Sequence, residues 1–97
     1  MIRSFGSKAT EDFYHGRRSA QARRVPSGIR SAAYRKLDLL NAASSVEDLR
    51  SPPGNRLEQL SGNYAGFHSI RINQQWRIVF RWLEGGAENV EIVDYHR

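Results

Sequence analysis

The sequence lacks cysteine altogether, and this absence removes several kinds of chemistry. Without a thiol, the 97-residue chain has no disulfides, no thiolate nucleophile and no cysteine-based zinc or iron–sulfur site. Only three histidines are present, and their spacing is not that of zinc ligands. Phosphate loops of the GxxxxGK type, GxSxG and HExxH are absent as well. We therefore expect no metal and no other cofactor.

Long hydrophobic runs are also missing. No apolar stretch approaches the roughly 20 residues that a membrane span needs, and residues 1–13 do not have the hydrophobic core of a secretory signal. We expect a cytoplasmic protein without a membrane partner. Apolar residues make up 39% of the chain and prolines number only three, which favours a folded globule over a disordered segment. This length suits a single domain covering residues 1–97.

Acidic residues are scarce in the first part of the chain. Residues 1–36 contain nine Lys and Arg against two acids, a net charge of +7, whereas residues 37–97 contain six against eight, a net charge of −2. Most of these cations are arginines, which can bind a phosphate through two donors. The stretch HGRRSAQARR has no apolar residue larger than alanine to anchor it to a core. It favours a basic connection that contacts nucleic acid, and the alternatives are a solvated face or a patch for an acidic protein. Its arginines are Arg17, Arg18, Arg23 and Arg24.

The first half of the chain shows helical periodicity. Residues 2–5 alternate between apolar and polar and predict a short strand. Ser7 is a suitable cap for a helix that ends near Gly16, and Pro26 is placed to begin a second helix that runs to about Ala43. The apolar stripe of this second helix consists of Ile29, Ala33, Leu37 and Leu40. Lys36 falls outside that stripe.

From Arg56 onward the period changes to two, which predicts strands beginning near Leu57 and within residues 68–73, 76–83 and 90–93, with the DYH triplet at the end of the last strand. Residues 76–83 carry large side chains on both faces, as a central strand does. Gly85 and Gly86 predict a hairpin turn. The expected order is a strand, two helices and an antiparallel meander, an α+β fold in which the helices cover one sheet face and leave the other for a ligand.

A few side chains have the chemistry for acid–base catalysis on an anion. His96 titrates near neutrality, although a histidine at this place can also be an exposed bystander. Glu58 can complete an acid–base pair or simply face solvent. Arg77, on the expected central strand, needs either a carboxylate partner or an anionic ligand. Arg71 and Arg81 either extend a phosphate-binding surface or pair with carboxylates across strands.

The segment PPGNRLEQLSGNYAGFHSIRINQQWRIVFRW, followed by VEIVDYH, resembles the HigB branch of the RelE and ParE toxin superfamily. MIRSF and RKLDLLNAASSVEDL fit the same pattern, so the likeness covers nearly the whole chain. The resemblance implies a RelE-like fold and the toxin of a toxin–antitoxin pair, usually a ribosome-dependent endoribonuclease that cuts mRNA. It also implies three partners, namely a HigA-like helix-turn-helix antitoxin, the ribosome and mRNA.

The resemblance places the terminal catalytic triplet of HigB proteins on Asp94, Tyr95 and His96. In this interpretation Tyr95 stacks on a base or orients the phosphate, and Asp94 holds a neighbouring cation. The chain departs from the family at Glu58, where HigB enzymes have a histidine, and at Ser61, where they have a lysine that contacts phosphate. YoeB toxins, which belong to the same superfamily, have glutamate at the first of these positions.

The mechanism that the resemblance implies needs no metal. Glu58 accepts the proton of a ribose 2′-hydroxyl, His96 protonates the departing 5′-oxygen, and Arg77 stabilises the phosphorane with Arg71 or Arg81. The N-terminal arginines then bind ribosomal RNA.

Two other functions stay open from the sequence. A ParE-like inhibitor of DNA gyrase has the same fold, although it has no evident need for an acid–base pair. A binding module with a degenerate site is the second, because the lysine expected by the resemblance is replaced by Ser61.

Overall fold

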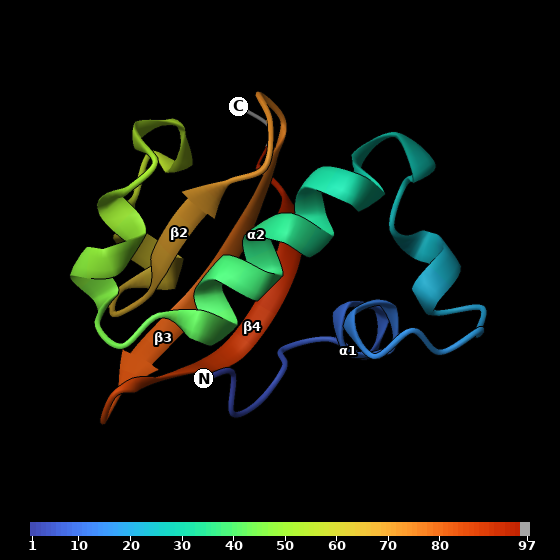
Figure 1. Cartoon of the computed structure of the whole chain (residues 1–97), viewed down its shortest axis with the longest axis horizontal. Helices are drawn as coiled ribbons and strands as arrows, with labels where there is room; N and C mark the ends of the chain where they lie inside the picture. The colour runs from blue at the N-terminus through green and yellow to red at the C-terminus, as the bar shows by residue number, and fades with distance from the viewer. Residues whose placement is uncertain (96–97) are drawn as a thin grey trace.

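The computed structural model of the chain describes residues 1–95. Its centre is a four-stranded sheet in the order β1-β2-β3-β4, in which each strand is antiparallel to the next (Figure 1). The meander and the α+β class are as predicted, and β3 lies between two neighbours, as a central strand should. The strands are β1 (Glu58–Gln59), β2 (His68–Arg71), β3 (Trp76–Leu83) and β4 (Gly86–Asp94).

The turn between β3 and β4 lies one residue earlier than predicted. Glu84 and Gly85 have φ values of 50° and 78°, so both adopt the left-handed conformation that a tight two-residue hairpin requires. Gly86 instead begins β4, opposite Leu83. Its lack of a side chain allows Arg3 to approach and donate hydrogen bonds to the carbonyls of Leu83 (3.0 Å) and Glu84 (2.7 Å).

The N-terminal residues run parallel to β4, but they do not form a full strand. Isolated bridges join Ile2 to Ala87 and Phe5 to Val90. The predicted extended conformation is therefore present, and its pairing is limited to two points.

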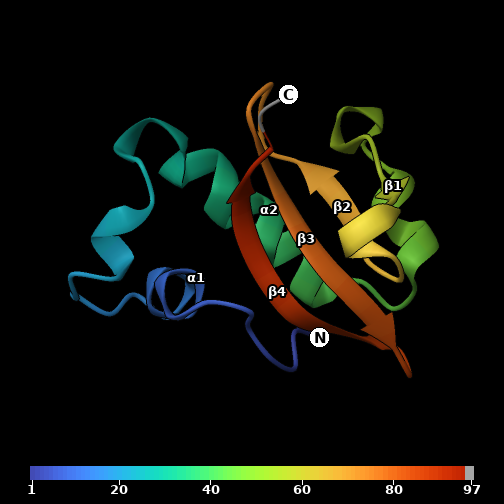
Figure 2. The ribbon, with the colours of Figure 1, turned by 180° about the vertical axis from the view of Figure 1, so that it is seen from behind.

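Helix α1 (Lys8–Tyr14) begins at Ser7, whose side chain accepts a hydrogen bond from the Thr10 amide, as the sequence predicts. The helix does not cover a sheet face, so this part of the prediction is wrong. It lies beside the edge strand β4 (Figures 1 and 2), where the Thr10 hydroxyl oxygen accepts a hydrogen bond from the Ile92 amide at 3.0 Å. The buried residues of α1 are the polar Thr10 and Asp12, which suit a backbone edge better than an apolar face.

Helix α2 (Arg30–Ala42) covers one face of the sheet and leaves the opposite face uncovered (Figures 1 and 2). A short 3₁₀ turn, Ser27–Ile29, precedes it directly after Pro26. The predicted apolar stripe is fully or almost fully buried and packs against the sheet. The core side chains that it joins there include Ile70, Ile78 and Phe80. Within residues 1–95, no helix is long and apolar enough to cross a bilayer.

Lys36 is buried, contrary to the prediction that it lies off the packed face of α2. Its ammonium group donates a hydrogen bond to the side-chain oxygen of Asn55, which is itself fully buried. The Asn55 amide donates to the carbonyls of Leu49 (3.1 Å) and Ser51 (3.2 Å). Burial lowers the pKa of Lys36. This polar cluster joins α2 to the loop before β1, which the apolar spacing alone does not reveal.

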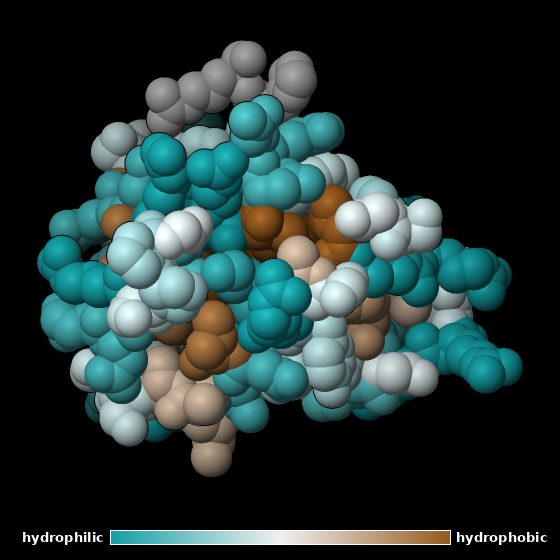
Figure 3. All heavy atoms as spheres, turned by 45° about the horizontal axis from the view of Figure 1, so that its top comes forward, coloured by the Kyte–Doolittle hydropathy of each residue, from teal (hydrophilic) through white to brown (hydrophobic). Residues whose placement is uncertain are grey.

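The basic segment 15–25 forms a lobe that projects away from the sheet, at the right of Figure 1, and its surface is largely hydrophilic in Figure 3. Its last residue, Val25, is buried in the hydrophobic core, and a polar residue, Asp12, anchors the segment as well. The Asp12 carboxylate accepts hydrogen bonds from Ser19 (2.7 Å) and Arg17 (3.0 Å). The bond from Ser19, with those from Arg17 and Lys8, lowers the pKa of Asp12 to about 2.

Candidate active site

Arg77 lies on the uncovered face of the central strand β3, near the start of that strand, with only 7% of its surface exposed. Its Nε donates to the Ser69 hydroxyl at 2.8 Å, and its Nη2 donates to the Arg56 carbonyl at 2.6 Å. The same Nη2 lies 3.6 Å from Oε1 of Glu58. Since a buried cation needs partners, these contacts explain how the central strand tolerates an arginine. They also hold the guanidinium in one orientation.

The strand register brings these residues together. Glu58 of β1 is opposite Ser69 of β2, and Arg71 of β2 is opposite Arg77 of β3. Cross-strand partners share a face, and alternate residues of a strand share it too. The four side chains therefore lie together on the face opposite α2.

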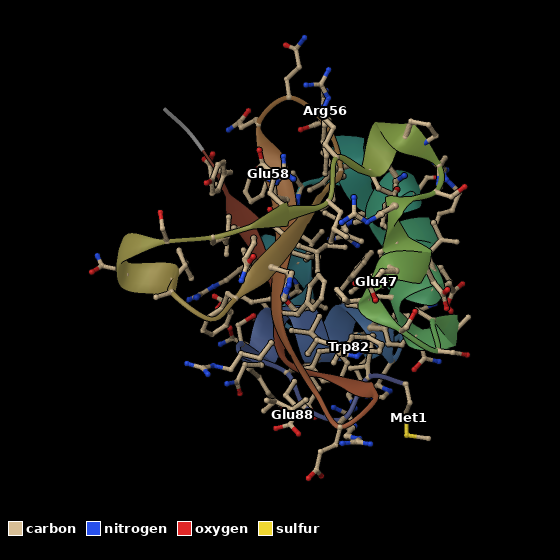
Figure 4. All side chains as sticks on the ribbon, turned by 90° about the vertical axis from the view of Figure 1, so that its left-hand side faces the viewer. Met1, Glu47, Arg56, Glu58, Trp82 and Glu88 are labelled. Atoms are coloured by element: carbon tan, nitrogen blue, oxygen red, sulfur yellow. The ribbon has the colours of Figure 1, made fainter. Side chains whose placement is uncertain are left out.

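The backbone before β1 supplies one wall of the site. Arg56 has a φ of 44°, in the left-handed region, and its carbonyl accepts the bond from Arg77. Figure 4 shows Arg56 and Glu58 near one another at one end of the molecule, with Trp82 and Glu88 toward the other end. The site thus lies at the end of the sheet away from the β3–β4 hairpin.

The electrostatics of the site favour an anion. Burial lowers the pKa of Arg77, and the charge of Glu58 acts in the opposite direction. An arginine nevertheless stays protonated in a protein, so the buried group remains a cation. Glu58 has 48% of its side chain exposed, which leaves its carboxylate accessible to a substrate.

An open cleft of about 680 Å³ surrounds these groups. Four of the predicted site residues line it: Glu58, Arg71, Arg77 and Tyr95. The Arg77 guanidinium carbon lies 5.6 Å from the centre of the Tyr95 ring, and the Tyr95 amide donates to the Gln75 carbonyl at 2.7 Å. The remaining lining residues are Arg56, Asn73, Gln74 and Gln75.

Other predicted site residues lie elsewhere. The Asp94 carboxylate accepts a hydrogen bond from the Gln75 amide at 3.0 Å, so its partner there is a neutral amide rather than the expected cation. Arg81 lies four residues from Arg77 along β3, with its guanidinium over the Phe67 ring at 4.7 Å, and it is set apart from the cleft. His96 lies outside the described residues.

Several known proteins are similar to this chain in sequence or in fold. Residues 3–96 match the HigB-like toxin family, described as the RelE-like toxin of the type II toxin–antitoxin system HigB. Toxin HigB-1 of Vibrio cholerae is 44% identical over 97 residues, which is 100% of this chain and 99% of that protein. The chain belongs to the HigB-like toxin family.

Two further proteins are similar to this HigB-like toxin. An uncharacterized protein of Haemophilus influenzae is 36% identical over 67 residues, which is 69% of this chain and 66% of that protein. The YoeB–YefM complex from Staphylococcus aureus contains a chain with the same fold, at a TM-score of 0.60 and 17% identity, covering 100% of this chain and 99% of that one. The RelE-like fold that the sequence implied is confirmed. The family is the toxin component of type II systems, so its partner is an antitoxin.

The arginines of the basic lobe are all exposed in this HigB-like toxin, and one of them is also bound to a carboxylate. Arg17 is bound to Asp12 and helps to hold the lobe together. Arg18, Arg23 and Arg24 are exposed. The lobe lies beyond α1 and the β4 edge. The sequence indicated that its cations are on the surface, but it did not show which arginine also anchors the lobe and which can contact a ligand.

Sequence reasoning missed the residues that hold Arg77 in place. Ser69 is fully buried and accepts the bond from Arg77 Nε, and the Arg56 carbonyl receives Nη2. The alternation of the strand places Ser69 on the same face as Arg71, and this is the one signal that could have indicated it. The backbone contact at Arg56 leaves no mark in the pattern of residue types.

Proposed function

We propose that this HigB-like toxin is an endoribonuclease that cuts mRNA on the ribosome by acid–base catalysis in the Arg77 cleft. The observation that supports it is the closeness of a solvent-accessible carboxylate, Glu58, to a fixed, buried guanidinium, 3.6 Å away. When the attacking nucleophile is the 2′-hydroxyl of the RNA itself, cleavage requires a base beside the ribose and a positive charge beside the phosphate. Both are available here within one cationic cleft.

In the proposed reaction, Glu58 accepts the proton of the ribose 2′-hydroxyl. The 2′-oxygen then bonds to the adjacent phosphorus as the bond from phosphorus to the 5′-oxygen breaks, which leaves a 2′,3′-cyclic phosphate and a 5′-hydroxyl. His96, by its family resemblance, supplies the proton to the departing 5′-oxygen. The steps balance without a metal or a further reactant.

Arg77 stabilises the negative charge that grows on the phosphoryl oxygens. Its hydrogen bonds to Ser69 and to the Arg56 carbonyl fix the guanidinium before the substrate binds. A charge that is already oriented costs little reorganisation during the reaction, and this is why such groups contribute strongly to rate. Arg71, in the same cleft, adds a second positive charge for the phosphate.

Tyr95 and Asp94 take supporting roles in this proposal. The Tyr95 ring, beside Arg77, orients the phosphate or stacks on a base. Asp94 holds the side chain of Gln75, which lines the cleft. Arg81 lies apart from the cleft, and in this proposal it contacts more distant phosphates of the RNA.

The ribosome and the antitoxin complete the proposal. The exposed arginines Arg18, Arg23 and Arg24 contact ribosomal RNA through its phosphates, and Arg17 keeps the lobe in shape. The antitoxin is a HigA-like helix-turn-helix protein, and the toxin acts in the cytoplasm, where the ribosomes are.

The decisive experiment measures cleavage of mRNA on programmed ribosomes. For Glu58→Gln we expect the cleavage rate to fall by about 10²- to 10⁴-fold, the usual contribution of a general base. For Arg77→Lys, which keeps the charge but loses the fork of donors, we expect a fall of about 10²- to 10³-fold. The matched control is Glu88→Gln, which neutralises a carboxylate at the opposite end of the same sheet and should leave the rate unchanged.

Cleavage by Glu58→Gln as fast as by the parent protein would refute the proposal. Intact mRNA together with gyrase-linked DNA breaks would instead indicate a ParE-like inhibitor. Neither product, with antitoxin binding preserved, would indicate a degenerate binding module.

A further inference from the structure

A second depression adjoins the cleft across β1. It has a volume of about 290 Å³ and is lined by Glu58, Gln59, Leu60, Ser61, Tyr64 and Tyr95. Glu58 and Tyr95 also line the Arg77 cleft, so the two depressions meet at these side chains and together make up a groove.

The two halves of the groove differ in charge. Three arginines, Arg56, Arg71 and Arg77, line the first half. Among residues 1–95, the lining of the second half contains no cation, and offers instead an amide at Gln59, a hydroxyl at Ser61 and aromatic rings. The first half therefore suits a phosphate, whereas the second suits an uncharged, flat group with hydrogen-bonding edges.

The Tyr64 ring is held in place before any ligand binds. The loop that carries it projects from the sheet between β1 and β2 (Figure 4), and is closed by a hydrogen bond from the Leu60 amide to the Phe67 carbonyl at 2.8 Å. The Tyr64 and Phe67 rings are in edge contact, with 5.6 Å between their centroids, and the Arg81 guanidinium lies over Phe67. Tyr64 still has 37% of its surface exposed.

We infer that the second half of the groove is a nucleobase subsite, in which Tyr64 stacks on the base of the nucleotide that carries the attacking 2′-hydroxyl. Along a nucleotide the order is phosphate, ribose and base, and along the groove the order is Arg77, Glu58 and Tyr64. A ribose placed at Glu58 therefore presents its 2′-hydroxyl to the carboxylate with its base toward Tyr64. This inference rests on the proposed function and adds to it a subsite on the 5′ side of the cleaved bond.

The test uses two uncleavable probes and NMR titration. The first is a dinucleotide with a 2′-O-methyl group on its first ribose, and the second is the same molecule without the first base. Tyr64→Ala should weaken binding of the complete dinucleotide by about tenfold, within the range known for loss of one stacking ring, and leave binding of the abasic probe unchanged. Tyr64→Phe should bind both like the parent, because stacking does not need the hydroxyl. Tyr34→Ala, which removes an exposed tyrosine from α2, is the control and should change neither.

Two results would overturn the subsite. One is equal affinity of the parent for both probes, and the other is an equal effect of Tyr64→Ala on both. Arg77→Ala separates this failure from that of the proposed function. If Arg77→Ala weakens the binding of both probes, the phosphate cleft is supported even when the base subsite is refuted. If Arg77→Ala weakens the binding of neither probe, or if the parent protein binds neither probe, the proposed function and the subsite are both refuted.

Discussion

Replacing Asn55 with alanine should destabilise the toxin strongly and disturb the wall of the cleft. Asn55 is fully buried and makes three hydrogen bonds, from Lys36 and to the carbonyls of Leu49 and Ser51. The next residue is Arg56, which adopts the left-handed conformation and whose carbonyl accepts a hydrogen bond from Arg77. The Asn55 side chain thus fixes the backbone whose carbonyl accepts the hydrogen bond from Arg77.

The magnitude follows from the bonds that are lost. Each of the two neutral bonds contributes about 1 kcal/mol and the bond to the Lys36 ammonium about 1.5–3 kcal/mol. We expect the free energy of unfolding to fall by about 4 kcal/mol, out of the roughly 5–15 kcal/mol typical of such domains. At about 4–8 °C per kcal/mol, the Tm should fall by about 16–32 °C.

The assay is urea unfolding of the parent, Asn55→Ala, Lys36→Met and the double variant. Lys36→Met keeps the packing of the aliphatic part of the side chain. It should lower the free energy of unfolding by about 1–3 kcal/mol, because it leaves the Asn55 oxygen without a donor. The double variant should lose less than the sum, since both changes remove the same bond. Asn63→Ala, at an exposed asparagine, is the control and should stay within about 0.5 kcal/mol. A loss below about 1 kcal/mol in Asn55→Ala, or strictly additive losses, would refute this reasoning.

Three further predictions concern the basic lobe and helix α1. Arg18→Glu combined with Arg23→Glu should weaken ribosome binding and make it less sensitive to salt, as measured by sedimentation at several salt concentrations, without changing the Tm. The Asp12 carboxyl has a pKa of about 2, below its unfolded value of 3.8, so its stabilising effect is present above pH 3.8 and is lost as the pH falls toward 2. Asp12→Asn should therefore speed amide exchange in the lobe and remove that pH dependence. Burial and the hydrogen bond to Asp38 raise the pKa of Tyr14 to about 12, so its contribution is present below pH 10 and lost between pH 10 and 12. Tyrosinate absorbance should show this late titration, and Asp38→Asn should bring it to lower pH.

The contrast between the two helices shows how far periodicity reaches. The apolar stripe of α2 is long enough to require an apolar partner, so its burial on the sheet could be predicted from spacing alone. Helix α1 is 7 residues long and buries Thr10 and Asp12, and such a helix has no stripe that would name its partner. At the edge of β4 it accepts a hydrogen bond at Thr10 from the Ile92 amide, 82 residues away in the sequence, and its Phe13 and Tyr14 rings pack, partly buried, against the core.

The sequence by itself determined the strand meander, the α2 stripe, the family and the residue types that stand together at Glu58 and Arg77, because each of these depends on local spacing or on short motifs. Only the tertiary structure decided which groups hold them. Ser69, the Arg56 carbonyl and the Lys36–Asn55 pair support the cleft through contacts between residues 8 to 21 positions apart. Such contacts follow from strand register and from the need to satisfy buried polar groups, which are properties of the packed chain and not of any one segment.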